Sequence, residues 1–334
     1  MKYSKVRFGI LGCSNVAKKS MLPAMKDSES AEISMIGSRT KQKATEYCKI
    51  FGCNAYGTYE DVINNKGIDA VYISLPAGLH EEWTVKAAKA GKHVLCEKPA
   101  TTSLASAKRM SDTCRKNKVR LLEGFMFKHH PQHKKAKELI KNGVLGELLN
   151  FYGCFAYRMP DSGNIRLKKE LGGGVMNDSM PYPVYAGRMF FGEPVSVVCS
   201  LKIDKKLGVD LKADIIMGYQ DGKTAFASSA FGSYYQSTYS ILGSKAFLRM
   251  KRAYAITRDM ETSIFLDEDD KSNEIIIEPA DHFRLMVDDF CAEIMSNKKS
   301  KNYEEDLLAQ AKVLEAARIS HKEKRIVKIS ELRI

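Results

Sequence analysis

The sequence has no long hydrophobic run and no clustered cysteines. Its 334 residues are 44% hydrophobic and 28% charged, and no apolar stretch is long enough to cross a bilayer, so we expect a globular chain without a membrane span. The eight cysteines are scattered and include no Cys-x-x-Cys pair, which argues against a zinc-finger pattern and a disulfide framework. The first residues lead directly into a strand-like run at Val6 without a signal-peptide pattern, so we expect a cytoplasmic location.

The sequence also lacks a block of unbalanced charge, although its formal net charge is +13. Basic residues alternate with acids along helical segments, as in Lys134 to Lys141 with Glu138, so nucleic-acid binding is not expected. A basic surface equally suits a phosphorylated cofactor or an anionic substrate. The three histidines at positions 129, 130 and 133 have no neighbouring carboxylate or cysteine, so we expect no metal site.

No internal repeat is present, and the first part of the chain alternates short apolar runs with helical patterns. This alternation predicts an α/β domain over residues 1–124, a Rossmann-type doubly wound parallel sheet. Ser103 is the expected N-cap of the last helix in this series. The expected strands are Val6–Leu11, Ala31–Gly37, Ala70–Leu75, His93–Cys96 and Arg120–Gly124.

The pattern changes after Pro131. Strand-like segments follow one another, and Asp221-Gly222 is a typical hairpin turn between Ala213–Tyr219 and Thr224–Phe231. Residues 125–334 are therefore predicted to form an α+β domain with an open, mostly antiparallel sheet. Because a large apolar sheet face seldom stays in water, we expect this domain to pair with a second copy in a homodimer or homotetramer.

The first strand runs into a turn that resembles a dinucleotide-binding fingerprint. Gly12, Ser14 and Ala17 occupy its three small-residue positions, with Ser14 replacing the usual second glycine. Such a turn admits a pyrophosphate beside a helix N-terminus, although an ordinary βα turn would carry similar residues. The expected cofactor contacts here are Gly12, Cys13, Ser14, Asn15 and Val16.

The end of the second predicted strand lacks the acidic residue that binds the adenosine ribose of NAD. Ser38 and Arg39 stand there instead, with Lys43 one helical turn further. A hydroxyl and a guanidinium suit a 2′-phosphate, whereas the alternative is an ordinary solvated arginine. The sequence therefore predicts NADP(H) as the cofactor.

Two further segments follow predicted strands of the same sheet. Leu75, Pro76 and His80 come after one strand, and Glu97 and Lys98 after the next. Ligands bind at the carboxyl ends of the strands in such sheets. We therefore count all five as cofactor-site candidates, although alone His80 would be a helix-start residue and Lys98 a surface lysine.

Together these motifs resemble the Gfo/Idh/MocA family, named for glucose–fructose oxidoreductase, inositol dehydrogenase and a rhizopine-catabolism protein. The similarity runs over nearly the whole chain, and it implies that Lys98 is catalytic and contacts both substrate and cofactor. It also implies a cis peptide bond before Pro99. The motifs are the first glycine turn, Leu75-Pro76 with His80, Glu97-Lys98-Pro99, the segments 123–127 and 129–132, and Gly172-Gly173-Gly174 followed by Asp178.

Many family members carry an Asp-x-Gly-x-His pattern after the glycine run. Here Asp178 is present, but Met180 replaces the glycine and Tyr182 the histidine. This exchange is similar to the glucose–fructose oxidoreductase, dihydrodiol dehydrogenase and deoxysugar 3-ketoreductase branches, which implies that Tyr182 is the acid or base. A phenol titrates near ~10, and a nearby ammonium such as that of Lys98 would lower its pKa. Asp178 would orient a substrate hydroxyl or Lys98.

The leading hypothesis is NADPH-dependent reduction of a sugar ketone, for example a nucleotide-linked 3-keto-deoxysugar. Arg158, Arg166 and Lys168 are the candidate anion or hydroxyl contacts. The reverse reaction, oxidation of an aldose or a trans-dihydrodiol with NADP, uses the same groups and stays open. A regulator that binds NADP without turnover is the third hypothesis, and it predicts loss of Lys98 or Tyr182.

Overall fold

The computed structural model describes residues 5–296 and 300–333, and the chain divides into two compact units. The first comprises Met1–Met126 and His282–Leu308, and the second comprises Phe127–Asp281 and Ala309–Ile334. The predicted domains, 1–124 and 125–334, differ from these units in one main respect, because residues 282–308 belong to the first unit. No helix in the described part of the chain is long and apolar enough to span a membrane.

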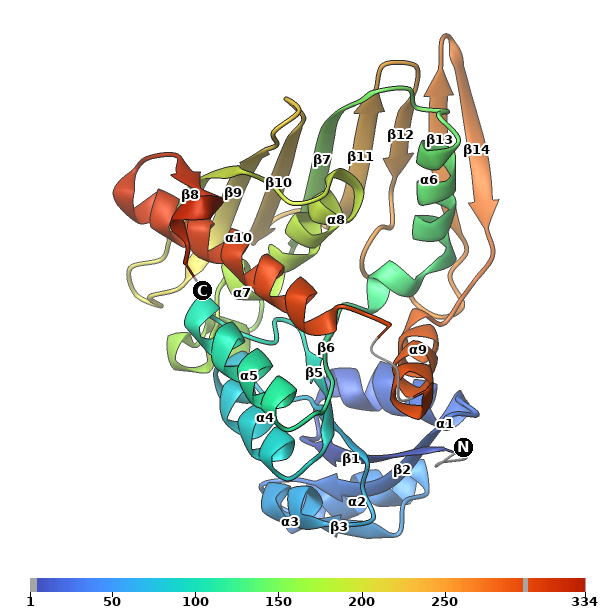
Figure 1. The fold of residues 1–334 in the computed structure, drawn as a ribbon, viewed down its shortest axis with the longest axis vertical. Helices are drawn as coiled ribbons and strands as arrows, with labels where there is room; N and C mark the ends of the chain where they lie inside the picture. Colours follow the sequence, from blue (N-terminus) through green and yellow to red (C-terminus); the bar gives the residue numbers. More distant parts are fainter. Residues whose placement is uncertain (1–4, 297–299, 334) are drawn as a thin grey trace. The chain divides into compact units, whose positions relative to one another are not determined.

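The first unit is built on a six-stranded parallel sheet with the order β3-β2-β1-β4-β5-β6 (Figure 1). This is the predicted doubly wound sheet, with β3 as an additional short edge strand. The order reverses at β1, so the carboxyl ends of β1 and β4 flank the point where ligands bind in such folds. The strands are β1 (Val6–Leu11), β2 (Ala31–Gly37), β3 (Ala55–Gly57), β4 (Ala70–Ile73), β5 (His93–Glu97) and β6 (Leu121–Gly124).

Helices cover both faces of this sheet. One core joins β1 side chains such as Phe8 to Met25 of α1, Phe51 of α2 and Phe290 of α9. Ser103 caps α5 by accepting a hydrogen bond from Ser106 N at 3.2 Å, as predicted. The helices are α1 (Leu22–Asp27), α2 (Lys41–Phe51), α3 (Tyr59–Asn64), α4 (His80–Lys89), α5 (Leu104–Lys116), α9 (His282–Ser296) and residues 303–308 of α10 (Tyr303–Glu323).

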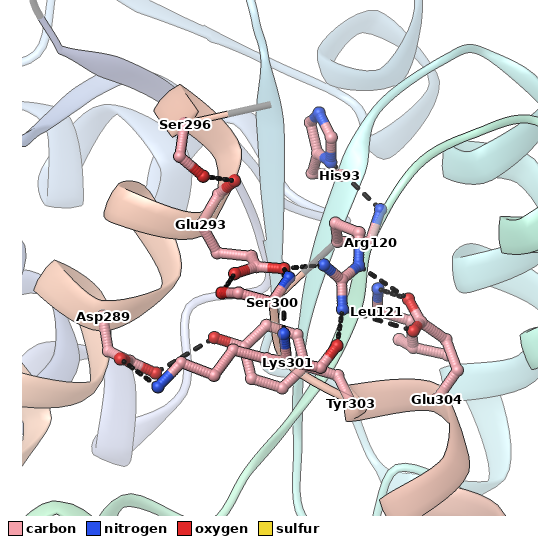
Figure 2. Close-up of polar contacts among 10 residues, drawn as sticks. All are labelled: His93, Arg120, Leu121, Asp289, Glu293, Ser296, Ser300, Lys301, Tyr303 and Glu304. Carbon is pink, nitrogen blue, oxygen red and sulfur yellow. Dashed lines mark hydrogen bonds and ion pairs between the residues drawn. The ribbon is translucent and has the colours of Figure 1, made fainter. Parts of the chain in front are cut away.

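A buried ion cluster centred on Arg120 fastens the late segment to this sheet (Figure 2). Arg120 precedes β6 and pairs with Glu293 of α9 and with Glu304 of α10, the latter at 3.2 Å. Glu304 also accepts a hydrogen bond from Leu121 N at 3.0 Å, and Glu293 accepts one from Ser300 N at 3.0 Å. Because all three charged side chains are at least 95% buried, each depends on the others for compensation.

The second unit is built on a nine-stranded sheet with the order β14-β13-β12-β11-β7-β10-β9-β8-β15. Only β7 and β10 pair in parallel among these strands, so the prediction of a mostly antiparallel sheet is confirmed. The hairpin predicted at Asp221-Gly222 joins β9 and β10. The strands are β7 (Leu148–Tyr157), β8 (Ser196–Ile203), β9 (Asp210–Gly218), β10 (Thr224–Phe231), β11 (Gln236–Gly243), β12 (Phe247–Met250), β13 (Thr262–Glu268), β14 (Lys271–Ile277) and β15 (Val327–Lys328).

Helices α6 (Pro131–Lys141), α7 (Val175–Asp178), α8 (Pro181–Phe191) and residues 309–323 of α10 cover one face of this sheet (Figure 1). On the other face, Tyr152 of β7 lies opposite Phe226 of β10, Phe226 opposite Ile216 of β9, and Ile216 opposite Val198 of β8. All four side chains are exposed, and the Tyr152 and Phe226 rings are stacked with centroids 5.2 Å apart. A continuous apolar row therefore crosses four neighbouring strands.

Candidate active site

The first turn has a backbone that only glycine accommodates well. Gly12 has a φ of +104°, and a Cβ at this position would lie 2.9 Å from a methyl carbon of Leu75 and 3.1 Å from Ser74 O. Gly12 N donates to Gly37 O at 3.0 Å, and Ser74 Oγ donates to Gly12 O at 3.1 Å. The turn is thereby fixed against β2 and β4, with its backbone close to the sheet edge.

The next residues open the first helix. Ser14 Oγ accepts a hydrogen bond from Ala17 N at 3.1 Å, and Ser14 O accepts one from the Tyr47 hydroxyl at 3.2 Å. The helix starts at Asn15, passes through a π-helical segment, Ala17–Met21, and continues as α1. Asn15 is exposed, and Cys13 and Val16 are half-buried. Ser14, which replaces the usual glycine, therefore caps this helix with its hydroxyl, whereas a glycine would only leave space for a pyrophosphate.

The end of β2 brings the predicted 2′-phosphate residues near this turn. Ser38 is buried, and its hydroxyl interacts with the Cys13 thiol. Arg39 and Lys43 are exposed. Arg39 lies beside Tyr59, whose pKa is raised by burial and lowered in part by that guanidinium. Lys43 O lies 3.8 Å from Cys13 Sγ. Ser38, Arg39 and Lys43 therefore all lie near the first turn.

His80 is the first residue of α4, and its ring is buried between two backbone segments. Nε2 lies 2.8 Å from Leu75 O, and Nδ1 lies 2.9 Å from Pro99 O. Burial lowers the pKa of His80, and the charge of Lys98 acts in the same direction. Because both ring nitrogens face protein carbonyls, His80 connects the segment after β4 to the segment after β5. Its contact with the cofactor stays a prediction.

Lys98 follows β5 directly, and the Lys98-Pro99 peptide bond is cis, as expected. The Glu97 carboxyl group is buried and accepts a hydrogen bond from the Tyr72 hydroxyl at 2.7 Å. Burial raises the pKa of Glu97, although Tyr72 and Lys98 favour its charged form. After the proline, Ala100 N donates to the Glu123 side chain at 2.8 Å. The backbone on both sides of Lys98 is therefore held by buried polar groups.

Tyr182 belongs to the second unit and lies in the first turn of α8. Its side chain is buried among aromatic rings, with the ring of Phe155 at 5.0 Å in edge contact, Tyr254 at 5.6 Å and Phe127 at 5.7 Å between centroids. These rings restrict the orientation of the phenol. The N-terminal end of α8 therefore presents a fixed tyrosine next to Asp178, which ends α7.

Tyr157 and Arg166 both hold Asp178. Tyr157, the last residue of β7, donates a hydrogen bond to Asp178 Oδ2, and Arg166 Nε donates to Oδ1 at 3.0 Å. Burial and the Asp178 carboxylate raise the pKa of Tyr157, and Arg166 opposes this effect. The pKa of Arg166 is raised by Asp178 and also by the Tyr157 and Tyr182 phenols. The four polar side chains therefore form one electrostatic cluster.

The glycine run explains how Arg166 reaches this cluster. A Cβ at Gly173 would lie 2.5 Å from Arg166 O, and Gly174 N, at a residue with φ of +101°, donates to that oxygen at 2.9 Å. The loop before the run therefore packs directly on the glycines. Arg158 and Lys168, the other predicted anion contacts, are exposed in the same unit.

The histidines near α6 have structural partners. His133 Nδ1 lies 2.9 Å from the Tyr239 hydroxyl, and its Nε2 lies 3.0 Å from Ala253 O. His130 caps α6 by accepting a hydrogen bond from Gln132 N at 3.3 Å, and burial lowers its pKa to about 4. Within residues 5–296 and 300–333, no group of three or more His, Cys, Asp or Glu side chains is arranged to hold a metal ion.

Comparison with known families agrees with this arrangement of units. Residues 6–125 match the model of an oxidoreductase family with an NAD-binding Rossmann fold, and residues 133–249 match the Gfo/Idh/MocA C-terminal domain. The chain belongs to the Gfo/Idh/MocA oxidoreductase family. The resemblance inferred from the motifs is therefore confirmed.

Several relatives within this family cover almost the whole chain. A dTDP-3,4-didehydro-2,6-dideoxy-α-D-glucose 3-reductase of Actinomadura kijaniata is 30% identical over 94% of this chain and 95% of its own. An NADP-dependent D-xylose 1-dehydrogenase of Haloferax volcanii is 31% identical over 92% and 95%. The crystal structure of the A. kijaniata 3-ketoreductase KijD10 with NADP and TDP-benzene has a TM-score of 0.91, at 30% identity over 95% and 98% of the two chains.

Four residues that hold the candidate segments received no role from the sequence, although Glu123 lies in one of the family motifs: Tyr157, Glu123, Tyr72 and Ser74. Tyr157 directly precedes Arg158, which was selected for its charge, but a tyrosine at a strand end carries no motif. The carboxyl end of β6 also contains Glu123, and strand ends are where ligand sites form in these sheets. That rule was the available signal for Glu123.

Proposed function

We propose that this chain is an NADP(H)-dependent oxidoreductase that reduces the carbonyl of a nucleotide-linked keto-sugar. The observation that carries the proposal is the alignment of Gly12, Pro76 and Lys98 after the neighbouring strands β1, β4 and β5. This edge combines a turn without side chains, which suits a pyrophosphate, with a cation at the place where a nicotinamide reacts. Relatives that carry out NADP-dependent keto-sugar reduction support the same assignment.

The first unit would hold the cofactor through the Gly12 turn, Ser38 and Arg39. Two features of this unit fit NADP(H). The pyrophosphate can approach the backbone in the space that a Cβ at Gly12 would fill, and the hydroxyl and guanidinium after β2 suit the 2′-phosphate. An acid at that position would repel a 2′-phosphate, whereas Ser38 and Arg39 favour it. The bound NADPH supplies the hydride, and the protein must supply the proton.

Tyr182 is the proposed proton donor in reduction and acceptor in oxidation, and Lys98 polarises the substrate carbonyl. KijD10 has been crystallised with a lysine replaced by alanine or glutamate and with a tyrosine replaced by phenylalanine. Those two positions stand as far apart in that chain as Lys98 and Tyr182 do here, which supports the assignment of both roles.

Asp178 would then orient a substrate hydroxyl near Tyr182. Since Arg166 already donates to Asp178, we propose that Arg166 and Tyr157 fix this carboxylate. Arg158 and Lys168 stay the candidates for contact with a substrate diphosphate. The proposal thus changes Arg166 from a direct anion contact to a residue that acts through Asp178.

A second proposal concerns assembly. The exposed row Tyr152, Phe226, Ile216 and Val198 lies on the sheet face opposite helices α6, α7 and α8 (Figure 1). Pairing of this face with the same face of another copy would bury the row from both sides. We therefore propose a homodimer through the sheet.

The oxidation of an aldose or trans-dihydrodiol is the alternative activity, supported by the xylose dehydrogenase and by trans-1,2-dihydrobenzene-1,2-diol dehydrogenases that are 26–27% identical over 70% of this chain. Steady-state oxidation of NADPH should be measured against keto-sugars with and without a nucleoside diphosphate. Reduction of NADP should be measured against aldoses and dihydrodiols. We expect the highest kcat/KM with a nucleotide-linked ketone. A higher value for a free aldose or a diol would favour the alternative, and no turnover in either direction would favour a non-catalytic regulator.

A further inference from the structure

Two cysteines meet at the end of helix α2. Cys48 lies in the last turn of α2, and Cys53 follows the glycine that ends this helix. The Sγ atoms of the two cysteines are 2.7 Å apart. Both thiols donate to the same acceptor, Ala55 O, at 3.1 and 3.0 Å. No other pair of cysteine sulfurs in the described part of the chain is in hydrogen-bond contact.

The helix C-terminus creates this contact. Gly52 is in the left-handed conformation with φ of 76° and ψ of 29°. Gly52 N and Cys53 N both donate to Cys48 O, at 2.9 and 3.1 Å. In this capping motif, the residue after the glycine turns back over the residue that begins the last turn, and the two side chains usually make an apolar contact. Here cysteines hold both positions, so the cap itself brings the thiols together.

We propose that Cys48 and Cys53 form a site of reversible thiol oxidation that closes to an intramolecular disulfide. A disulfide needs Cα atoms that are about 4.4–6.8 Å apart and side chains that face each other. The capping motif joins the two backbones through the hydrogen bond from Cys53 N to Cys48 O, and the sulfur contact shows that the side chains face each other. A pair that exchanges between the dithiol and the disulfide would be a redox-sensing site rather than a permanent structural bridge.

In the oxidation, both S–H bonds break and one S–S bond forms. The two electrons and two protons that leave the thiols reduce an oxidant such as diamide, whose N=N bond becomes the N–N bond of a hydrazine. Both cysteines are more than nine-tenths buried. Burial and the adjacent Cys53 thiol raise the pKa of Cys48 to about 12. Because the thiolate is the reactive form, the rate should increase with pH.

The chemistry of the surroundings favours a disulfide over a metal site. A structural zinc ion needs four ligands, and no cluster of three or more metal-ligating side chains is present among the described residues. The pair also lies close to the cofactor turn, because the neighbouring Tyr47 hydroxyl donates to Ser14 O. The disulfide proposal itself does not depend on the proposed enzymatic activity.

Peptide mapping tests the proposal directly. The reduced, folded protein is treated with diamide, unfolded, alkylated and digested with trypsin. Lys49 separates the two cysteines, so the disulfide would link peptide 44–49 to peptide 50–66. We expect this linked pair in most molecules, its loss after dithiothreitol, and faster formation at pH 9 than at pH 7.

Two variants define the outcome. Cys48→Ser should abolish the linked pair, and Cys291→Ser should retain it, because Cys291 is a buried thiol whose described contacts include no sulfur neighbour and whose pKa burial likewise raises to about 12. If diamide-treated wild-type protein still has alkylated Cys48 and Cys53, or if other cysteine pairs account for most of the disulfide, the proposal is wrong. The wild-type result decides this even if a variant fails to fold.

Discussion

Tyr157 donates a hydrogen bond to the carboxylate of Asp178, whose other oxygen is bound by Arg166. The tyrosine ends β7 and the aspartate ends α7, so two elements distant in sequence share one polar contact. A carboxylate fixed at both oxygens keeps its orientation through a catalytic cycle. If Asp178 orients the substrate, Tyr157 is the residue that orients Asp178.

The variant Tyr157→Phe should therefore reduce kcat by roughly 10- to 100-fold, which corresponds to the free energy of a hydrogen bond to a charged group. The affinity for NADPH should not change. The loss should be smaller when Asp178→Asn is already present, because the two residues act as one unit. Steady-state kinetics of the two single variants and the double variant measure this coupling. Tyr152→Phe, on the same strand but on its exposed face, is the control. Strictly additive losses would show that Tyr157 does not act through Asp178.

The variant Tyr182→Phe should lower kcat by about 10²–10⁴-fold, the usual contribution of a positioned acid or base. Its ring contacts with Phe155 and Phe127 are kept, so the melting temperature should change little. Tyr254→Phe is the matched control, because the Tyr254 hydroxyl is buried without a hydrogen-bond partner and its ring lies next to Tyr182. Near-normal turnover of Tyr182→Phe would remove the tyrosine from the proton-transfer step.

The variant Arg39→Ala should raise the NADPH dissociation constant by at least about tenfold, because a charge-assisted contact to a 2′-phosphate is worth roughly 1.5–3 kcal/mol. NADH, which lacks that phosphate, should bind with unchanged affinity. Fluorescence titration with both cofactors measures the ratio. Lys49→Ala, at the other end of α2, should leave both constants unchanged. An equal loss for NADPH and NADH would contradict a 2′-phosphate contact.

The variant Arg120→Met should destabilise the protein by about 3–5 kcal/mol at neutral pH, because it leaves two buried carboxylates without their cation. Burial alone would raise the pKa of Glu293. Hydrogen bonds from Ser300 and Lys301, together with the Arg120 guanidinium, outweigh burial and hold this pKa below its usual range. Its stabilising contribution is therefore present above about pH 4.3, the unfolded value, and is lost as the pH falls through the folded pKa.

The difference between wild type and Arg120→Met should consequently shrink as the pH falls below about 4.3, as measured by urea unfolding between pH 7 and pH 3. Arg115→Met is the control. Arg115 of α5 pairs with Glu305 of α10, the neighbour of Glu304, but at an exposed site. Exposed pairs contribute about 0–1 kcal/mol. Equal losses for the two variants would indicate that burial of the Arg120 cluster has no special importance.

The variant Phe226→Lys should convert a dimer into monomers, because it places a charge in the centre of the apolar row beside Tyr152 and Ile216. Sedimentation velocity measures the change. Ile276→Lys changes an exposed residue of the edge strand β14 and should leave the assembly intact. A wild-type monomer at micromolar concentration would contradict the proposed pairing.

The sequence predicted the elements of this fold well where the periodicity was local. The strand Val6–Leu11 and the strand Thr224–Phe231 have the predicted bounds. The short strand β3 was missed because Ala55–Gly57 is too brief to show alternation. The packing of α9 in the first unit was not predicted either, because the apolar residues of a helix do not indicate which of two sheets the helix packs against.

The chemical identity of the candidate site was determined by the sequence itself. A glycine directly after the first strand, a lysine before a proline, and a tyrosine four residues after an aspartate are properties of neighbouring residues, and these local patterns also identified the family. The contacts that hold these residues were decided only by the tertiary structure: Tyr157 with Asp178, His80 with Leu75 and Pro99, and Arg120 with Glu293. The physical reason is that hydrogen bonds and buried ion pairs depend on distances in space, which chain folding sets between residues far apart in the sequence.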